Sequence, residues 1–211
     1  MNKSSDSKGQ AKKRSRKCSG TGNQRFFRDY ANKLSSVLAA ADWAPVLTLS
    51  QMILKVRNAK GRVFLCGNGG SAANAMHLAT DLVYAVTETT GMGVDAIALS
   101  ANPAVLTCLG NDTGYENIFG EQLAVSGREG DLLIVFSGSG SSQNVLHAIE
   151  VAHKLKMQTV AITGFDGGKC KQIAQLSIHF DVNDMQLSED LQLSVGHMVM
   201  KWLNTEIDNV L

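Results

Sequence analysis

Five short apolar runs, each followed by a segment with helical periodicity, constrain the fold of this chain more than any other feature. Runs of five or six apolar residues suit buried strands better than helices. Strands that alternate with helices predict an α/β protein, a parallel sheet with helices on both faces. The expected strands are residues 62–66, 94–99, 132–136, 159–163 and 176–180.

Helical periodicity begins at residue 25, where Phe26, Phe27, Tyr30 and Leu34 follow one another at spacings of one, three and four. A second helix over residues 45–60 precedes the first strand. No repeat and no linker interrupts the pattern afterwards, so we expect residues 25–211 to form a single domain with two leading helices. The later expected helices are 71–87, 104–109, 115–126, 142–156, 169–174 and 187–209.

The first 24 residues differ in composition from the remainder. They contain seven Lys and Arg residues against one Asp, a net charge of +6, while the whole chain has a net charge of only +1. Such a segment is too poor in apolar residues to fold alone. We interpret residues 1–24 as a flexible basic tail. A nucleic-acid-binding arm is the alternative, disfavoured because no aromatic residue lies among the charges.

Several other classes of protein are disfavoured by composition. No apolar run approaches the ~20 residues of a membrane helix, and no apolar stretch follows the basic N-terminus as in a secretory signal. The four cysteines (Cys18, Cys66, Cys108 and Cys170) include no Cys-x-x-Cys pair, which argues for reduced thiols over a cysteine zinc site. We expect a cytoplasmic protein with no membrane partner.

A glycine-rich loop, residues 67–73, joins the first expected strand to a helix. Its glycines allow a sharp turn and bring backbone N–H groups close to a ligand, and the helix start favours an anion. The loop is neither a dinucleotide fingerprint nor a Walker A motif. A tight structural turn is the alternative interpretation.

A serine-rich loop, residues 137–142, follows the third expected strand and opens another helix. Its four hydroxyls, backbone donors and helix start are what a phosphate cradle requires, and a serine-rich helix cap is the alternative. Ligands of parallel sheets bind beyond the carboxyl ends of the strands. The two loops together therefore predict a phosphorylated ligand.

Two histidines and two carboxylates form a further candidate site. His77 and Asp81 lie four residues apart on one helix face. Glu189 and His197 lie eight apart on the last helix, about 80° apart around its axis. This set suits zinc or another divalent metal, and equally a general acid and base. An ordinary surface pair is the alternative for His77 and Asp81.

These segments resemble the phosphoheptose isomerases of the SIS superfamily and their relatives that associate with the replication initiator. The matching stretches are CGNGGSAANAMH (66–77), LGNDTGYENIF (109–119), GREGDLLIVFSGSGSSQNV (127–145) and AITGFDGGK (161–169). The resemblance extends from about residue 25 to the C-terminus. It implies a flavodoxin-like three-layer sandwich with a five-stranded parallel sheet, assembled as a homotetramer with sites at subunit interfaces.

The resemblance also implies an activity. Family members isomerise sedoheptulose 7-phosphate to D-glycero-D-manno-heptose 7-phosphate through an enediol, which supplies a precursor of lipopolysaccharide and other surface glycans. One zinc or other divalent ion per subunit would polarise the sugar oxygens. The alternative is a non-catalytic SIS protein that binds a partner such as the replication initiator.

Site residues follow from the matching motifs. Those expected at the sugar are Asn68, Gly69, Gly70, Ser71, Asn111, Asp112 and Glu189. Those expected at the phosphate are Ser137, Gly138, Ser139 and Ser142. The expected metal ligands are His77, Asp81, Glu189 and His197. The proposed base is Asp81 or Glu189 and the proposed acid is His197. The family has Glu at the position of Asp81 and Gln at that of Glu189, so we interpret the pair as an exchange in which Glu189 takes over the role of base.

Overall fold

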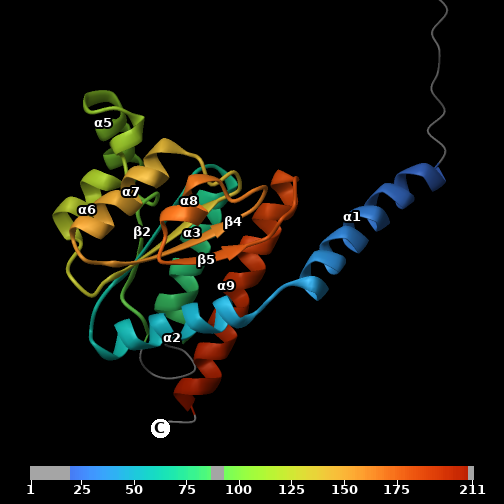
Figure 1. The fold of residues 1–211 in the computed structure, drawn as a ribbon, viewed down its shortest axis with the longest axis horizontal. Coiled ribbons are helices and arrows are strands. Elements are labelled where there is room, and N and C mark those ends of the chain that lie inside the picture. The colour runs from blue at the N-terminus through green and yellow to red at the C-terminus, as the bar shows by residue number, and fades with distance from the viewer. Residues whose placement is uncertain (1–19, 87–92, 209–211) are drawn as a thin grey trace, which may run out of the picture. The chain divides into compact units, whose positions relative to one another are not determined.

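A computed structural model describes residues 20–86 and 93–208 of the 211-residue chain (Figure 1). The chain divides into two units between Ser36 and Val37, and each is described by itself. Most of the predicted basic tail, residues 1–19, lies outside the described residues, so its flexibility stays a prediction.

The first unit consists of the first part of helix α1 (Gly20–Ala40), which begins five residues before the predicted start. Phe26 and Phe27 lie next to each other with their rings edge to face at a centroid distance of 5.8 Å. Both rings are about two-thirds exposed. This part of α1 is therefore helical, as its periodicity predicts, with exposed aromatic side chains.

The second unit contains a five-stranded sheet in which every neighbouring pair of strands is parallel (Figure 1). The strand order is β2-β1-β3-β4-β5. Each observed strand starts and ends within two residues of its prediction. The strands are β1 (Val63–Gly67), β2 (Ala96–Ala98), β3 (Leu132–Ser137), β4 (Gln158–Thr163) and β5 (Leu176–His179). The predicted α/β fold with a parallel five-stranded sheet is confirmed.

The strand order reverses between β1 and β3, and this reversal places the glycine-rich loop next to the serine-rich loop. From β1 the chain moves outward to the edge strand β2, then returns to β3 on the other side of β1. Gly67 at the end of β1 pairs with Phe136 near the end of β3. The loops that leave these strands consequently start side by side, at the point where doubly wound sheets bind their ligands.

Helices cover both faces of the sheet (Figure 1). Helices α2, α3 and α9 pack together on one face, and α6, α7 and α8 lie on the other, where Phe64 and Val135 of the sheet meet Leu123 and Ile149. The helices are α2 (Ala44–Asn58), α3 (Gly70–Thr80), α5 (Pro103–Asp112), α6 (Gly120–Ser126), α7 (Gln143–Lys154), α8 (Gly168–Ile173) and α9 (Met185–Asp208).

Two predicted helices differ from the structure. Residues 115–126 form a short 3-10 turn η2 (Tyr115–Asn117) and then α6, because the chain dips into the core at Ile118 and Phe119 between them. The helix predicted for 71–87 is α-helical only to Thr80 and continues as a π-helical turn η1 (Asp81–Ala85). Such wider turns inside helices often accompany functional sites. Thr87 lies outside the described residues.

Among the described helices, none is by itself both long and apolar enough to cross a membrane, although α1 and α2 would meet the length and composition requirement if taken as one bent pair.

Candidate active site

A pocket lies beyond the carboxyl ends of β1 and β3, where the strand order reverses. Its volume is about 90 Å³. The glycine-rich loop, the serine-rich loop and the first turns of α9 all contribute to its wall. The lining residues are Asn68, Ser71, Phe136, Ser137, Gly138, Ser139, Ser142, Met185 and Glu189. The structure therefore brings together the two loops that the sequence predicts to bind a phosphorylated ligand.

The glycine-rich loop owes its shape to residues without a side chain. Gly69, directly before α3, has φ +56° and ψ −124°, a conformation that residues with a Cβ rarely adopt. A Cβ on Gly67 would lie 2.8 Å from the backbone oxygen of Phe136, so glycine there lets the two strands' ends approach. Asn68 and Ser71 are thereby placed on the pocket wall.

The serine-rich loop is braced from outside by the segment that follows β4. The backbone N–H of Gly164 donates to the oxygen of Gly138 at 2.9 Å, and that of Cys170 donates to the oxygen of Gly140 at 2.9 Å. Gly140 has φ +66° and packs so closely on Gly167 that no Cβ would fit. These contacts hold two of the loop's carbonyls against the segment after β4 and leave Ser137, Gly138 and Ser139 on the pocket wall.

Two serine hydroxyls of this loop accept hydrogen bonds from its own backbone N–H groups. The N–H of Gly140 donates to Oγ of Ser137 at 3.0 Å, and that of Ser141 donates to Oγ of Ser139 at 3.3 Å. Ser142 is the residue immediately before α7, so its hydroxyl lies at a helix N-terminus. The loop thus holds neutral donors and a helix end around one small space, which suits a phosphate.

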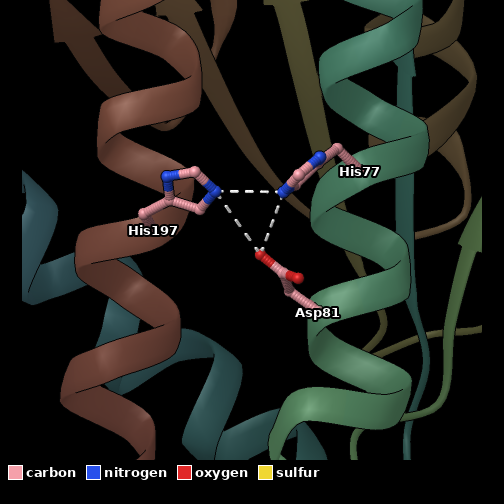
Figure 2. A group of neighbouring side chains, drawn as sticks. All are labelled: His77, Asp81 and His197. Atoms are coloured by element: carbon pink, nitrogen blue, oxygen red, sulfur yellow. Dashed lines mark hydrogen bonds and ion pairs between the residues drawn. The ribbon is translucent and has the colours of Figure 1, made fainter.

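Two histidines and one carboxylate meet between α3 and α9 (Figure 2). Nε2 of His77 lies 3.0 Å from Nε2 of His197. Oδ2 of Asp81 lies 3.5 Å from Nε2 of His77 and 3.9 Å from Nε2 of His197. Oδ2 of Asp81 is buried and has no hydrogen-bond partner in the part of the chain that the structure describes.

This geometry fits a metal ion. A tetrahedral zinc with bonds of about 2.1 Å separates its ligand atoms by about 3.4 Å, close to the three distances observed. The two Nε2 atoms at 3.0 Å can share one proton in a hydrogen bond, but the buried Oδ2 of Asp81 has no hydrogen-bond partner among the described residues, and a shared cation would satisfy it. The structure thus brings His197 next to His77 and Asp81, three of the four residues predicted as metal ligands.

Glu189, the fourth expected ligand, lies elsewhere. Its carboxylate lies against Gly70 at the start of α3, where it lines the pocket. Eight residues separate Glu189 from His197, and at ~1.5 Å per residue they are about 12 Å apart along α9. Their similar direction around the helix, on which the prediction depended, does not offset this axial separation. The structure therefore brings three of the four predicted ligands together and places Glu189 apart from them.

Asn111 and Asp112, also expected at the sugar, do not line the pocket. They lie at the end of α5, exposed, and Nδ2 of Asn111 donates to Oδ1 of Asp112 at 2.7 Å. Four residues that the sequence analysis did not single out take part in the site instead. They are Tyr115, Asn144, Met185 and Gln192.

Met185 and Gln192 are placed by α9. A Cβ on Gly138 would lie 2.5 Å from Sδ of Met185, so glycine in the serine-rich loop makes room for this side chain. Oε1 of Gln192, a buried residue, accepts hydrogen bonds from Oγ of Ser71 at 2.9 Å and Nδ2 of Asn74 at 3.3 Å. Asn74 also donates to the backbone oxygen of Glu189 at 2.8 Å. Polar contacts thus fix α9 against α3 between the pocket and the histidines.

Comparison with known proteins agrees with this geometry. Residues 25–164 match the family model described as the SIS domain. The phosphoheptose isomerase of Akkermansia muciniphila is 38% identical over 170 residues, which cover 80% of this chain and 87% of the relative. That of Rhodospirillum rubrum is 37% identical over 161 residues, covering 76% and 82%.

The chain belongs to the phosphoheptose isomerase family of SIS-domain proteins.

Solved structures of this phosphoheptose isomerase family share the fold. The phosphoheptose isomerase of Neisseria gonorrhoeae superposes with a TM-score of 0.80 at 28% identity, covering 87% of this chain and 99% of that one. The one from Francisella tularensis gives 0.78 at 25% identity, covering 89% and 98%. These relatives are named as isomerases, which favours the enzyme over the partner-binding alternative.

Proposed function

We propose that this chain isomerises sedoheptulose 7-phosphate to D-glycero-D-manno-heptose 7-phosphate. Its membership in the phosphoheptose isomerase family supports the reaction. The observation that carries the proposal for this chain is that α3 and α9 each contribute to both the His77–Asp81–His197 cluster and the pocket, with Asp81 directly after α3 at the start of η1. A phosphate group and the reacting end of a sugar can thereby be held by one site.

The serine-rich loop binds the phosphate in this proposal. The phosphate oxygens accept hydrogen bonds from the hydroxyls of Ser137, Ser139 and Ser142. The positive end of the α7 helix dipole lies next to them and stabilises the negative charge. Asn68 and Ser71 contact the sugar from the opposite wall. The phosphate fixes one end of the substrate, so that the carbons next to the carbonyl are held in position for proton transfer.

Proton transfer then needs one base and one acid. The base takes a proton from C1 of the ketose while the acid gives a proton to the carbonyl oxygen at C2, which forms the enediol. Return of a proton to C2 and loss of one from the oxygen on C1 produces the aldose. Glu189 is the proposed base, because it is the carboxylate that lines the pocket. His197 is the proposed acid and would act through Nδ1, since its Nε2 faces His77 and Asp81 and has no proton to give when it holds the ion.

His77, Asp81 and His197 are the residues that would hold one zinc or other divalent ion per subunit. When bound, the ion polarises the sugar oxygens during enediol formation. Asp81 therefore keeps its predicted place in the chemistry as a ligand, while the role of base moves to Glu189.

The decisive experiment measures metal content by mass spectrometry together with conversion of sedoheptulose 7-phosphate. We expect about one metal ion per chain, loss of turnover with a chelator, and recovery on adding metal back. Protein that is folded and metal-loaded but does not convert this substrate contradicts the proposed reaction. Full turnover after complete removal of metal contradicts the proposed role of the ion.

The variant Glu189→Gln distinguishes the proposed role of Glu189 as base from that of Asp81 as metal ligand. We expect turnover to fall by about 10²-fold or more, as for loss of a general base, with metal content unchanged, since Glu189 lies outside the histidine cluster. Full turnover in this variant would show that Glu189 is not the base.

We further propose a cytoplasmic homotetramer in which residues 25–211 form one SIS domain. Exposed apolar side chains around edge strand β2 support the assembly, and two apolar cavities of about 650 and 560 Å³ flank Ile97 there. Exposed apolar surface of this extent commonly marks an interface between subunits. The exposed side chains are Met76, Val83, Tyr84, Ile97 and Val125.

A further inference from the structure

Asn68, on the pocket wall, is held by three side-chain hydrogen bonds. Its Nδ2 donates to Oδ1 of Asn144 at 2.9 Å, and Nδ2 of Asn144 donates back to Oδ1 of Asn68 at 2.8 Å. The hydroxyl of Tyr115 donates to the same Oδ1 of Asn68 at 2.9 Å. The two amides thus form a closed pair that joins the glycine-rich loop to the first turn of α7.

A backbone group fixes which way round this pair lies. The N–H of Val145 donates to Oδ1 of Asn144 at 3.0 Å and is shared with the backbone oxygen of Ser142 at 3.1 Å. A backbone N–H can only donate, so the Asn144 atom that faces it must be the oxygen and not the nitrogen. The NH₂ group of Asn144 then points toward Asn68, and the Asn68 atom that accepts its hydrogen bond must be the amide oxygen. Since Asn144 is only 2% exposed, water does not compete for these groups.

The hydrogen-bonding capacity of Asn68 shows what it offers a ligand. An amide oxygen accepts two hydrogen bonds, and an amide nitrogen donates two. Asn144 and Tyr115 use both acceptor positions of Oδ1, and Asn144 takes one N–H. One N–H has no partner among residues 20–86 and 93–208, and it is the polar group of this side chain that is left for a ligand in the pocket. Asn68 can therefore meet a ligand oxygen that accepts, such as one of a sugar phosphate.

We propose that Asn144 is a positioning residue for the sugar phosphate: together with Tyr115 it locks the Asn68 amide so that an N–H faces the ligand. In its choice of ligand this rests on the proposed function. The pair also fixes the distance between the glycine-rich loop, which contains Asn68 and follows β1, and the start of α7, which contains Asn144 and follows β3. In the proposed complex these two segments bind the sugar and the phosphate.

Asn144→Asp tests the lock with almost no change in shape. The carboxylate still accepts from Val145 and from Nδ2 of Asn68, but it has no proton to donate to Oδ1 of Asn68. We expect the dissociation constant of the metal-loaded protein for sedoheptulose 7-phosphate, measured by calorimetry, to rise about tenfold, the effect of one misplaced hydrogen bond. Tyr115→Phe removes one donor only, and a smaller rise is expected.

Asn102→Asp is the matched control. The side-chain oxygen of Asn102 accepts from the N–H groups of Ala104 and Val105 at the start of α5. Aspartate caps a helix as well as asparagine does, and Asn102 lies outside the pocket. The dissociation constant should therefore stay within twofold of that of the parent protein.

A double-mutant cycle with Asn68→Ala distinguishes positioning from a general effect of the new charge. If Asn144 acts through Asn68, Asn144→Asp adds no further weakening once Asn68 is alanine. If the added negative charge simply repels the phosphate, or the fold is loosened, the variant weakens binding by the same factor in both backgrounds, and that result overturns the proposal. Should Asn144→Asp fail to fold, Tyr115→Phe, whose ring is 61% exposed, takes its place in the cycle.

The binding assay tests the role of Asn144 independently of whether the chain catalyses the proposed isomerisation. Binding without turnover would contradict the proposed function, while the cycle would still decide the role of Asn144. If the parent does not bind this sugar phosphate, the side-chain amide signals of Asn68 in the NMR spectrum of the free protein decide instead. We expect slow hydrogen exchange there that is lost in Asn144→Asp. Unchanged exchange would overturn the lock.

Discussion

Individual residues have different roles in the proposed site, and the difference is clearest for the carboxylates of Asp81 and Glu189. Asp81 lies between two imidazoles with a buried oxygen that lacks a hydrogen-bond partner in the described residues, whereas Glu189 lines the pocket. In the proposed reaction, the first carboxylate would neutralise the cation and the second would take the proton from the substrate. Replacing each by its amide should therefore produce different losses.

Asp81→Asn should lower both metal content and turnover. The amide keeps the shape but loses the negative charge that offsets the cation, so we expect metal content to fall several-fold and turnover to fall about 10²–10⁴-fold. Metal analysis and an isomerase assay on the same sample measure both. Asp95→Asn is the control, since Asp95 pairs with Arg62 at the opposite end of the strands (2.8 Å). Full metal content in Asp81→Asn would contradict its role as a ligand.

The cysteines should differ in reactivity. Burial raises the pKa of the Cys66 thiol above its usual range and that of Cys170 to about 12, so neither forms much thiolate at pH 8. Cys108 is exposed, and a hydrogen bond to Asp112 raises its pKa as well. We expect N-ethylmaleimide to label Cys108 of the folded protein at least about a hundredfold faster than Cys66 or Cys170. Peptide mapping before and after unfolding measures this, and equal labelling would be contrary to the structure.

At the scale of elements, helices α3 and α9 carry the site, and glycines set how closely they approach. Gly196 of α9 faces Leu78 of α3, and a Cβ there would lie 3.5 Å from Cδ1 of Leu78, an ordinary contact. Gly70 at the start of α3 has no such room, because the carboxylate of Glu189 occupies the space. The same substitution should thus have opposite consequences at the two positions.

Gly196→Ala should stabilise the protein by about 0.5–1 kcal/mol, since alanine loses less backbone entropy in a helix. That corresponds to a rise in melting temperature of roughly 2–4 °C, with turnover retained. Gly70→Ala should displace Glu189 and lower turnover by about tenfold or more. Calorimetry and the isomerase assay compare the two variants. Equal turnover in both would show that the position of Glu189 is unimportant for the reaction.

The elements were predictable from sequence where local chemistry decides them. The apolar runs that became β1 and β3, and the glycines and serines that follow, depend on neighbours in the chain and were placed correctly. Glu189 lies apart from the histidine cluster because the rise along α9 separates it from His197, which its angle around the helix axis does not reveal. Asn144 and Tyr115 were missed because their partner Asn68 lies 76 and 47 residues away. No local pattern reports such a contact.

For the whole molecule, the apolar surface around β2 is the feature that a single copy leaves unexplained. Strand β2 is only three residues long and forms the edge of the sheet. Ile97 at its centre is 38% exposed and lines both apolar cavities. An exposed apolar edge strand of this kind promotes association between molecules in solution. In the proposed tetramer this surface is covered by another copy of the chain.

Ile97→Lys should therefore disrupt the assembly. A lysine in an apolar interface leaves a charge without a partner, so we expect light scattering to give four times the 22.6 kDa chain mass for the parent and a smaller species for the variant. Because the proposed sites lie at subunit interfaces, turnover per chain should fall about tenfold or more as well. Gln51→Lys on α2, an exposed position that lines neither cavity, is the control for the added charge. A parent that is monomeric at assay concentration, or a fully assembled Ile97→Lys, would mean that this edge meets solvent and that each chain works alone.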